Sequence, residues 1–252
     1  MTAIAIDGPA GAGKSTIARA LARKLGYIYV DTGALYRSIG LYCTEAGVPL
    51  EDKVAVTAAL EQIRVELRYV DGVQRVLLNG RDVSEEIRRP EISLAASSVS
   101  AMDTVRAFLF DLQRNMALEH DVVMDGRDIG TVVLPDAQVK IYLTASAEER
   151  TRRRMAEYEA KGLHADFEEL LREVNLRDEQ DRNRAVAPLR KAEDAVELDS
   201  TCMNTEEVLA AIAENRHTAD EEGQAHPPSP VTKLNSWRMY IDESNWDRAA
   251  HR

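Results

Sequence analysis

The feature that most constrains this chain is a glycine-rich segment close to its N-terminus. Residues 8–15 read Gly-Pro-Ala-Gly-Ala-Gly-Lys-Ser and match the pattern GxxxxGK[ST] at every fixed position. The apolar run at residues 2–6 precedes this segment, and an amphipathic stretch at residues 14–25 follows it. A strand, a tight loop and a helix in this order present backbone N–H groups to phosphate. The sequence therefore predicts a nucleoside triphosphate site, a P-loop.

The residue types in this loop indicate how ATP would be held. The loop must wrap the phosphates so closely that larger side chains would collide with them, while its amides face the negative charge. We expect Lys14 to reach the β- and γ-phosphates and the Ser15 hydroxyl to hold Mg²⁺. The predicted ATP-binding residues are Gly8, Pro9, Ala10, Gly11, Ala12, Gly13, Lys14, Ser15 and Thr16.

The remaining apolar runs predict the fold class. Strand-sized runs occur at residues 27–30, 121–124, 139–143 and 195–198, and helical patterns occur at residues 14–25, 33–46, 104–119 and 147–160. The strands are continuously apolar, which is typical of parallel strands covered on both faces. We therefore expect an α/β protein with a P-loop NTPase fold, in which helices flank a five-stranded parallel sheet.

Two segments interrupt this alternation. Residues 64–83 alternate at period two and contain Asp71-Gly72 and Asn79-Gly80, which predict a small antiparallel β insertion in the acceptor region. Residues 150–190 are rich in arginine and predict a helical lid that Gly162 interrupts.

The predicted domain organisation follows from these interruptions. A single kinase domain is expected at residues 1–215, with an acceptor-binding insertion at about 38–105 and the lid at about 150–190. At residues 216–252 periodicity is lost and prolines gather, which predicts an extended or disordered tail carrying Trp237 and Trp246.

Composition excludes several function classes. The net charge of −11 argues against binding of long nucleic acids, which needs an excess of basic residues. The N-terminus has no signal-peptide pattern and the apolar runs are only strand-sized, so we expect a cytoplasmic protein with no membrane partner. Cys43 and Cys202 lie far apart and indicate neither a zinc site nor a disulfide. A monomer is expected, because no long exposed apolar stripe is evident.

Polar residues follow each apolar run: Asp7, Asp31, Asp125, Thr144 and Asp199. The ligand crevice of an open parallel sheet lies at the carboxyl ends of its strands, so chemistry is expected in the loops that start there.

The segment after the second run reads DTGALYR, from Asp31 to Arg37. It would direct Tyr36 and Arg37 inward, offering a ring and a phosphate-binding guanidinium to an acceptor. The alternative is a helix capped by Thr32 with an incidental arginine.

The segment after the third run reads DGRDIG. Asp125 is the expected carboxylate partner of Mg²⁺. Arg127 could bind the transferring or accepting phosphate, and Asp128 could accept hydrogen bonds from a base or sugar. The alternative is a tight turn with a surface ion pair.

The lid arginines form two groups, Arg150, Arg153 and Arg154 at one end and Arg177, Arg182 and Arg184 at the other. Together they could close on the phosphates and exclude water. The alternative is a solvated basic helix paired with its acidic neighbours, which accounts for Arg152.

Four motifs in register resemble one family. The segments IDGPAGAGKST, DTGALYR, DGRDIGTVVLPDAQVKIYL and RDEQDRNRAVAPL are similar to those of bacterial-type cytidylate kinases, P-loop nucleoside monophosphate kinases, across residues 2 to about 214. The resemblance implies ATP-dependent phosphorylation of CMP and dCMP to CDP and dCDP, with small-molecule nucleotides as the partners and Mg²⁺ as the metal.

The resemblance also implies roles for individual residues. Thr32 would contact the cytosine and Arg37 the acceptor phosphate, while Ser97, Arg106, Arg127 and Asp128 would read cytosine and hold its phosphate. Asp181 and Arg184 would contact the pentose hydroxyl and the phosphate. The predicted acceptor-binding residues are Thr32, Tyr36, Arg37, Ser97, Arg106, Arg127, Asp128, Asp181 and Arg184; the catalytic residues are Lys14, Arg127, Arg154 and Arg184; the metal ligands are Ser15 and Asp125.

Two alternatives stay open at this point. One is a P-loop kinase with another small acceptor, such as UMP, AMP, dephospho-coenzyme A or a shikimate-like molecule. The other is a regulator that binds ATP without turning it over and uses the tryptophan-bearing tail as a contact.

Overall fold

The structure is a computed structural model that describes residues 1–70, 73–160 and 162–212. Its chain divides into two compact units. The first unit consists of Met1–Val30 and the described residues from Met116 onwards, and the second consists of Asp31–Asn115. The predicted tail, with Trp237 and Trp246, lies outside the described residues.

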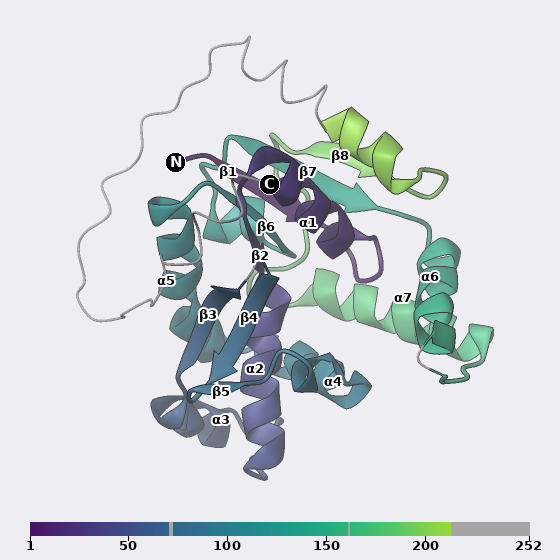
Figure 1. The fold of residues 1–252 in the computed structure, drawn as a ribbon. Helices are drawn as coiled ribbons and strands as arrows, with labels where there is room; N and C mark the ends of the chain where they lie inside the picture. The colour runs from purple at the N-terminus through teal and green to yellow at the C-terminus, as the bar shows by residue number, and fades with distance from the viewer. Residues whose placement is uncertain (71–72, 161, 213–252) are drawn as a thin grey trace. The chain divides into compact units, whose positions relative to one another are not determined.

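A five-stranded sheet in the order β2-β6-β1-β7-β8 forms the centre of the first unit (Figure 1). Its strands are β1 (Ala3–Asp7), β2 (Ile28–Asp31), β6 (Val122–Gly126), β7 (Val139–Thr144) and β8 (Val196–Asp199). The central strand β1 pairs in parallel with β6 on one side and β7 on the other. This confirms the predicted fold class. The polar residues that were expected to follow the strands are themselves among the last residues of those strands.

Helices cover the sheet because their apolar stripes match its buried side chains. In α1 (Lys14–Leu25), the residues Ile17, Ala18, Leu21 and Ala22 are buried at helical spacing. They pack with Ile4 and Ile6 of β1, with residues of β6 and β7, and with Val208 and Ile212 near the end of the described chain. Burial of this apolar stripe holds α1, and with it the preceding loop, against the sheet.

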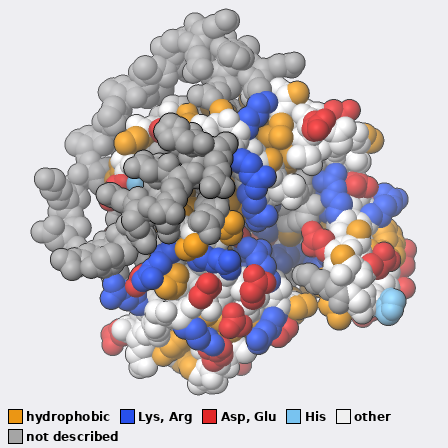
Figure 2. All heavy atoms as spheres, in the orientation of Figure 1, with side chains coloured by type: hydrophobic (Ala, Val, Ile, Leu, Met, Phe, Trp, Pro, Cys, Tyr) orange, Lys and Arg blue, Asp and Glu red, His pale blue; other side chains and the backbone are white. Residues whose placement is uncertain are grey.

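The predicted lid is helical, as expected. It consists of α6 (Ala147–Ala160) and α7 (Phe167–Asn183), and Gly162 lies between them with a φ of 71°. Asp166 caps α7 by accepting a hydrogen bond from the amide of Glu169. Acidic and basic side chains intermingle over these two helices on the face shown in Figure 2. This surface matches the solvated, ion-paired helix that was the alternative reading for some lid arginines.

The chain before and after β6 also forms helical elements. These are α5 (Asp103–Glu119) and the short π-helix η3 (Ile129–Val133). In the part of the chain that the structure describes, no helix has the length and apolar character needed to cross a bilayer.

The second unit combines a small sheet with helices. Its antiparallel strands are β3 (Val65–Val70), β4 (Val73–Leu78) and β5 (Arg81–Asp82), in that order. Asn79 and Gly80 both have positive φ between β4 and β5, as the predicted Asn-Gly turn requires. The meander is therefore confirmed, whereas its other turn, Asp71-Gly72, lies outside the described residues.

The helical elements of the second unit are α2 (Thr32–Glu45), α3 (Lys53–Ala59), η1 (Leu60–Gln62), η2 (Glu86–Arg88) and α4 (Pro90–Ser100). The sequence predicted α2 but not α3 or α4. Both unpredicted helices bury only a few apolar residues, Val56 and Ala59 in α3 and Ile92, Ala95, Ala96 and Val99 in α4. Such short patterns are hard to separate from loop sequence.

Candidate active site

The loop between β1 and α1 has the geometry of a phosphate cradle. Gly8 has a φ of +146°, and a Cβ atom placed on it would lie 1.9 Å from the carbonyl oxygen of Leu143 in β7. Only glycine fits there, because the loop leaves the sheet in contact with the neighbouring strand. Gly13 directly precedes α1, so the first amides of this helix face the loop.

Lys14 is buried at the first position of α1, and its Nζ donates a 2.7 Å hydrogen bond to the carbonyl oxygen of Pro9. Burial, and then the nearby charge of Arg127, lower the pKa of Lys14 to about 7, although the carboxylates of Asp125 and Asp181 oppose this shift. Burial therefore disfavours the charged form of Lys14, and an anion in the loop would favour it.

Ser15 and Asp125 lie next to one another. The Ser15 hydroxyl donates a 2.9 Å hydrogen bond to Oδ2 of Asp125, which belongs to β6, the strand adjacent to β1. Magnesium prefers oxygen ligands and often uses only one or two from the protein, with phosphate and water supplying the others. The predicted metal ligands are thus brought together, and a hydroxyl beside a carboxylate fits this ion.

Three further predicted residues meet at Asp181, near the end of α7. The Nε of Arg127 donates a 2.9 Å hydrogen bond to Oδ2 of Asp181, and Nη2 of Arg184 lies 3.9 Å from Oδ1. Burial opposes ionisation of Asp181, but the charges of Arg127 and Arg184 outweigh burial and lower its pKa. Because Asp181 and Arg184 are nearly buried, the alternative reading of Arg127 as part of a surface ion pair is not supported.

Asp128 is also buried, and its backbone begins the turn η3. Its carbonyl oxygen accepts hydrogen bonds from the amides of Val132 and Val133. The next two amides, those of Ile129 and Gly130, donate to the carboxylate of Asp7 at 2.8 and 2.7 Å. The DGRDIG segment is thus held against the end of β1 by a residue that the sequence had marked only as a polar strand end.

The lid arginines behave differently from one another. Arg150 was predicted to close on the phosphates, but its buried guanidinium bonds both carboxylate oxygens of Asp178 at 2.9 and 2.6 Å. It also donates to the carbonyl oxygens of Ala145 and Ala10. Through these hydrogen bonds Arg150 ties α6 to α7 and to the P-loop, so its guanidinium is engaged by the protein and does not face the phosphate site as a lid cation.

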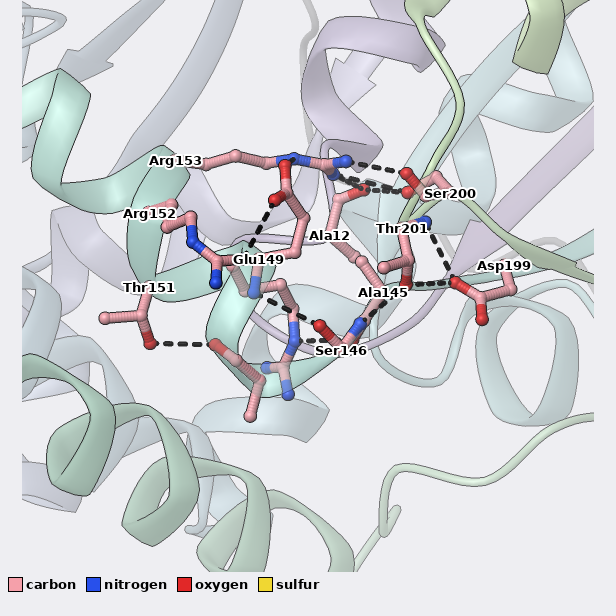
Figure 3. A network of polar contacts seen from close by, with 12 residues as sticks. Ala12, Ala145, Ser146, Glu149, Thr151, Arg152, Arg153, Asp199, Ser200 and Thr201 are labelled. Atoms are coloured by element: carbon pink, nitrogen blue, oxygen red, sulfur yellow. Dashed lines mark hydrogen bonds and ion pairs between the residues drawn. The ribbon is translucent and has the colours of Figure 1, made fainter.

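Arg153 is likewise engaged with the protein (Figure 3). Its guanidinium reaches across to the loop after β8, where it donates to the backbone oxygen of Ser200 at 2.7 Å and to its hydroxyl at 3.2 Å. Its Nη1 also donates a longer hydrogen bond of 3.4 Å to the carbonyl oxygen of Ala12 in the P-loop. Its Nε donates to the carboxylate of Glu149 at 3.0 Å. Arg152 pairs with the same glutamate at 3.6 Å, as the alternative reading expected.

Arg154, a predicted catalytic residue, contacts the other lid helix. Its Nη2 donates to the hydroxyl of Tyr158 at 3.1 Å and lies 3.4 Å from Glu173 of α7, and its guanidinium sits over the Tyr158 ring. These contacts place Arg154 within the lid, whereas Lys14, Arg127 and Arg184 are the predicted catalytic cations that interact with one common group of carboxylates.

In the second unit, the DTGALYR segment starts α2. Asp31, not Thr32, is the N-cap: its Oδ1 accepts a 3.0 Å hydrogen bond from the amide of Ala34. Its Oδ2 binds Arg37 at 2.8 Å and lies 4.0 Å from Arg88. Burial opposes ionisation of Asp31, but these two guanidinium groups lower its pKa. The alternative of a cap at Thr32 is wrong, and the two arginines share a single carboxylate.

Tyr36 and Arg106, two residues predicted separately to bind the acceptor, contact one another. The guanidinium of Arg106 lies over the Tyr36 ring, 5.5 Å from its centroid, and donates to the carbonyl oxygen of Ser100. Both residues are buried, whereas Ser97 is half-buried on α4. The ring orients this guanidinium, and an oriented guanidinium can donate hydrogen bonds to a planar ligand.

Sequence reasoning missed several residues of both units. Asp7 had a signal, its place at the end of β1, but no assigned role. Arg88 had none, because it lies in a single 3₁₀ turn that shows no periodicity. Gln74 of β4, whose Oε1 accepts a hydrogen bond from the amide of Asp31, is brought there only by the meander.

The fold and the P-loop site together define a P-loop kinase. A family model described as cytidylate kinase matches residues 4–218, and the chain belongs to the cytidylate kinase family. The cytidylate kinase of Carboxydothermus hydrogenoformans is 52% identical, over 84% of this chain and 95% of the relative. That of Lactobacillus johnsonii is 47% identical over 84% and 92%, and that of Syntrophotalea carbinolica 48% identical over 88% and 97%.

The glycine that opens the P-loop provides a first test. Gly8→Ala should abolish binding of a fluorescent ATP analogue and lower the melting temperature, because its Cβ would meet the Leu143 carbonyl oxygen. Gly26→Ala is the matched control: Gly26 has a φ of +70° but nothing within 4 Å, so only about 1 kcal/mol of backbone strain is expected. Undiminished binding by Gly8→Ala would contradict this loop geometry.

The second test concerns the stability contribution of Asp7. Burial raises its pKa from 3.8 to about 6, with the amides of Gly130 and Ile129 opposing the shift. The folded state therefore holds the Asp7 proton more tightly than the unfolded chain, and this stabilisation is lost as pH rises from about 4 to about 6. The free energy of unfolding of the natural protein should fall by about 2–3 kcal/mol relative to Asp7→Asn across this range. Urea unfolding of both proteins at pH 4 to 7 measures the difference between their free energies of unfolding. A difference that stays constant across this range would contradict the prediction.

Proposed function

We infer that this protein transfers the γ-phosphoryl group of ATP to CMP or dCMP and releases ADP with CDP or dCDP. The observation that carries the inference is the family match over residues 4–218, in a chain whose P-loop keeps Lys14, Ser15 and the facing Asp125 together. Relatives named cytidylate kinase at about half identity over most of their length support the same acceptor.

Phosphoryl transfer between two polyanions depends on positioning and charge neutralisation more than on proton chemistry. Lys14 supplies positive charge inside the P-loop, and the phosphates of ATP would restore the full charge that burial and Arg127 reduce. Arg127 and Arg184, held by Asp181, would stabilise the charge that develops on the phosphoryl group. The two arginines need no proton transfer to act, which agrees with the absence of a histidine among these contacts.

The acceptor roles extend the proposal. In the first unit, Asp128 would accept hydrogen bonds from the base, and Asp181 would bind the pentose hydroxyl. In the second unit, Thr32 would contact the cytosine, Tyr36 would offer a ring to pack on, and Arg37 would bind the acceptor phosphate. Ser97 and Arg106 would take part in reading cytosine and holding its phosphate. The cation–π contact of Arg106 with Tyr36 and the fixed orientation of Arg37 support these assignments.

Ser15 and Asp125 would hold a magnesium ion. When bound, this ion neutralises charge on the β- and γ-phosphate oxygens. The hydrogen bond between the Ser15 hydroxyl and Asp125 already sets these two oxygens at one edge of the sheet. The division into a kinase domain with an insertion at about 38–105 and a lid at about 150–190, the cytoplasmic location and the monomeric state stay predictions.

A coupled assay of ADP release tests the function directly. With ATP and magnesium, CMP and dCMP should be turned over at rates far above those with UMP and AMP, and the product should migrate as a diphosphate. Lys14→Met should abolish turnover while the protein stays folded by circular dichroism. Efficient turnover of AMP, or none of CMP and dCMP by folded protein, would overturn the proposal in favour of another acceptor or a regulator.

The arginine at the end of α7 should matter for chemistry more than for ATP binding. Arg184→Ala should lower kcat by about a hundred-fold, because it removes a charge near the transferring group. The dissociation constant for ATP should change by less than about three-fold in the same variant. Arg190→Ala, at an exposed position nearby, is the control and should leave both values unchanged. Equal losses in kcat and ATP affinity would contradict this role.

A further inference from the structure

Asp7 is a buried carboxylate at a strand end to which the sequence assigned no role. It is the last residue of β1, directly before Gly8 of the P-loop, and only 5% of it is exposed. Its two carboxylate oxygens each accept one backbone amide, Oδ1 that of Ile129 and Oδ2 that of Gly130. The residue thus joins two segments more than a hundred positions apart in the chain.

The two amides need a partner because they begin a helical turn. In η3, the amides of Val132 and Val133 donate to the carbonyl of Asp128, and that of Leu134 donates to Ile129. The first amides of any helical turn have no partner within the turn. A buried amide without a partner is costly, so the Asp7 carboxylate satisfies a need that this local segment creates.

Gly130 permits this close approach. A Cβ atom at this position would lie 3.4 Å from Oδ2 of Asp7 and 3.2 Å from Cδ of Lys140. The Lys140 side chain cannot easily move away, because its Nζ is bound to Asp194 and to the carbonyl oxygen of Pro135. A side chain at position 130 would therefore be crowded by Asp7 on one side and by Lys140 on the other.

The turn follows directly on two residues of the proposed site. The parallel pairing of β1 with β6 runs as far as Asp7 opposite Gly126. Arg127 and Asp128 come next, and the amides held by Asp7 come immediately after them. The segment that carries both residues is thus fixed before it by the sheet and after it by the Asp7 carboxylate.

We propose that Asp7 is a positioning residue, which fixes Arg127 and Asp128 relative to the P-loop by holding the amides of Ile129 and Gly130. This inference rests on the proposed function for its kinetic consequence, but not for its geometric content. Asp7 makes no contact with phosphate in this role. Its effect passes through the backbone of η3.

The variant Asp7→Asn tests the proposal with little change in size. An amide side chain has one oxygen, so it can accept only one of the two N–H groups and turns its own NH₂ toward the other. Asp121→Asn is the matched control, because Asp121 accepts the amide of Thr2 at the opposite end of the same two strands. It removes one negative charge from a carboxylate of the same kind, away from the proposed site.

Hydrogen exchange provides a readout that does not depend on activity. In the natural protein the amides of residues 129 and 130 should be protected, and Asp7→Asn should speed their exchange about ten-fold or more. Asp121→Asn should leave this segment unchanged. Unchanged exchange in Asp7→Asn would overturn the proposal even if the protein is an active kinase.

Kinetics test the consequence. At a temperature well below the melting point of each variant, Asp7→Asn should lower kcat with CMP by about ten-fold or more, because small displacements of positioned groups are costly. The directly measured dissociation constant for ATP should change less than about three-fold. Gly130→Ala, which disturbs the same contact without altering the Asp7 charge, should show the same pattern.

Two outcomes separate this inference from its alternatives. If Asp7→Asn weakens ATP binding as much as it lowers kcat, Asp7 acts through the charge of the P-loop lysine and not through η3, and the proposal is overturned. If the natural protein phosphorylates neither CMP nor dCMP, the proposed function fails, while the exchange result still decides whether Asp7 holds the turn.

Discussion

The burial of a lysine beside the P-loop is the constraint on which the rest of this site depends. Lys14 is the first residue of α1, and its ammonium donates a hydrogen bond back to the carbonyl oxygen of Pro9 in the preceding loop. Burial and Arg127 lower its pKa to about 7, so these surroundings disfavour its charged form. A polyphosphate bound in the loop would favour the charged form of Lys14. The apolar packing of α1 on β1, β6 and β7 keeps the lysine in place.

Buried carboxylates around this loop carry opposite pKa shifts for a physical reason. Asp7 is buried, with two backbone amides as hydrogen-bond donors and the Asp128 carboxylate nearby, so burial dominates and its pKa rises to about 6. Asp181 is buried too, but two guanidinium groups outweigh the cost and its pKa falls. The first group organises a backbone turn, and the second orients arginine side chains. The same residue type therefore does different work according to whether its partners carry charge.

The lid shows how neighbouring residues of one type acquire separate roles. Arg150, Arg152, Arg153 and Arg154 lie within one turn and a half of α6, and each successive side chain points about 100° further around the axis. Arg150 faces the buried Asp178, Arg153 reaches the loop after β8, and Arg154 contacts Tyr158 and Glu173. The arginines that form one basic cluster in the sequence thus connect α6 to three different parts of the protein. These are the P-loop, the loop after β8 and the helix α7. Most of its charge is thus used to hold the lid helix rather than left free.

The sequence by itself determined the P-loop, the five parallel strands and the Asn79-Gly80 turn, because each is encoded by spacing within a few residues. It also placed Lys14 and Ser15 between a strand and a helix, and Asp125 and Arg127 at the end of another strand, where a parallel sheet gathers them. Only the tertiary structure decided that Asp7 holds Ile129 and Gly130, that Arg150 pairs with Asp178, and that Arg88 approaches Asp31. These partners are distant in the chain, and no local pattern specifies which of several similar charges burial will bring into contact.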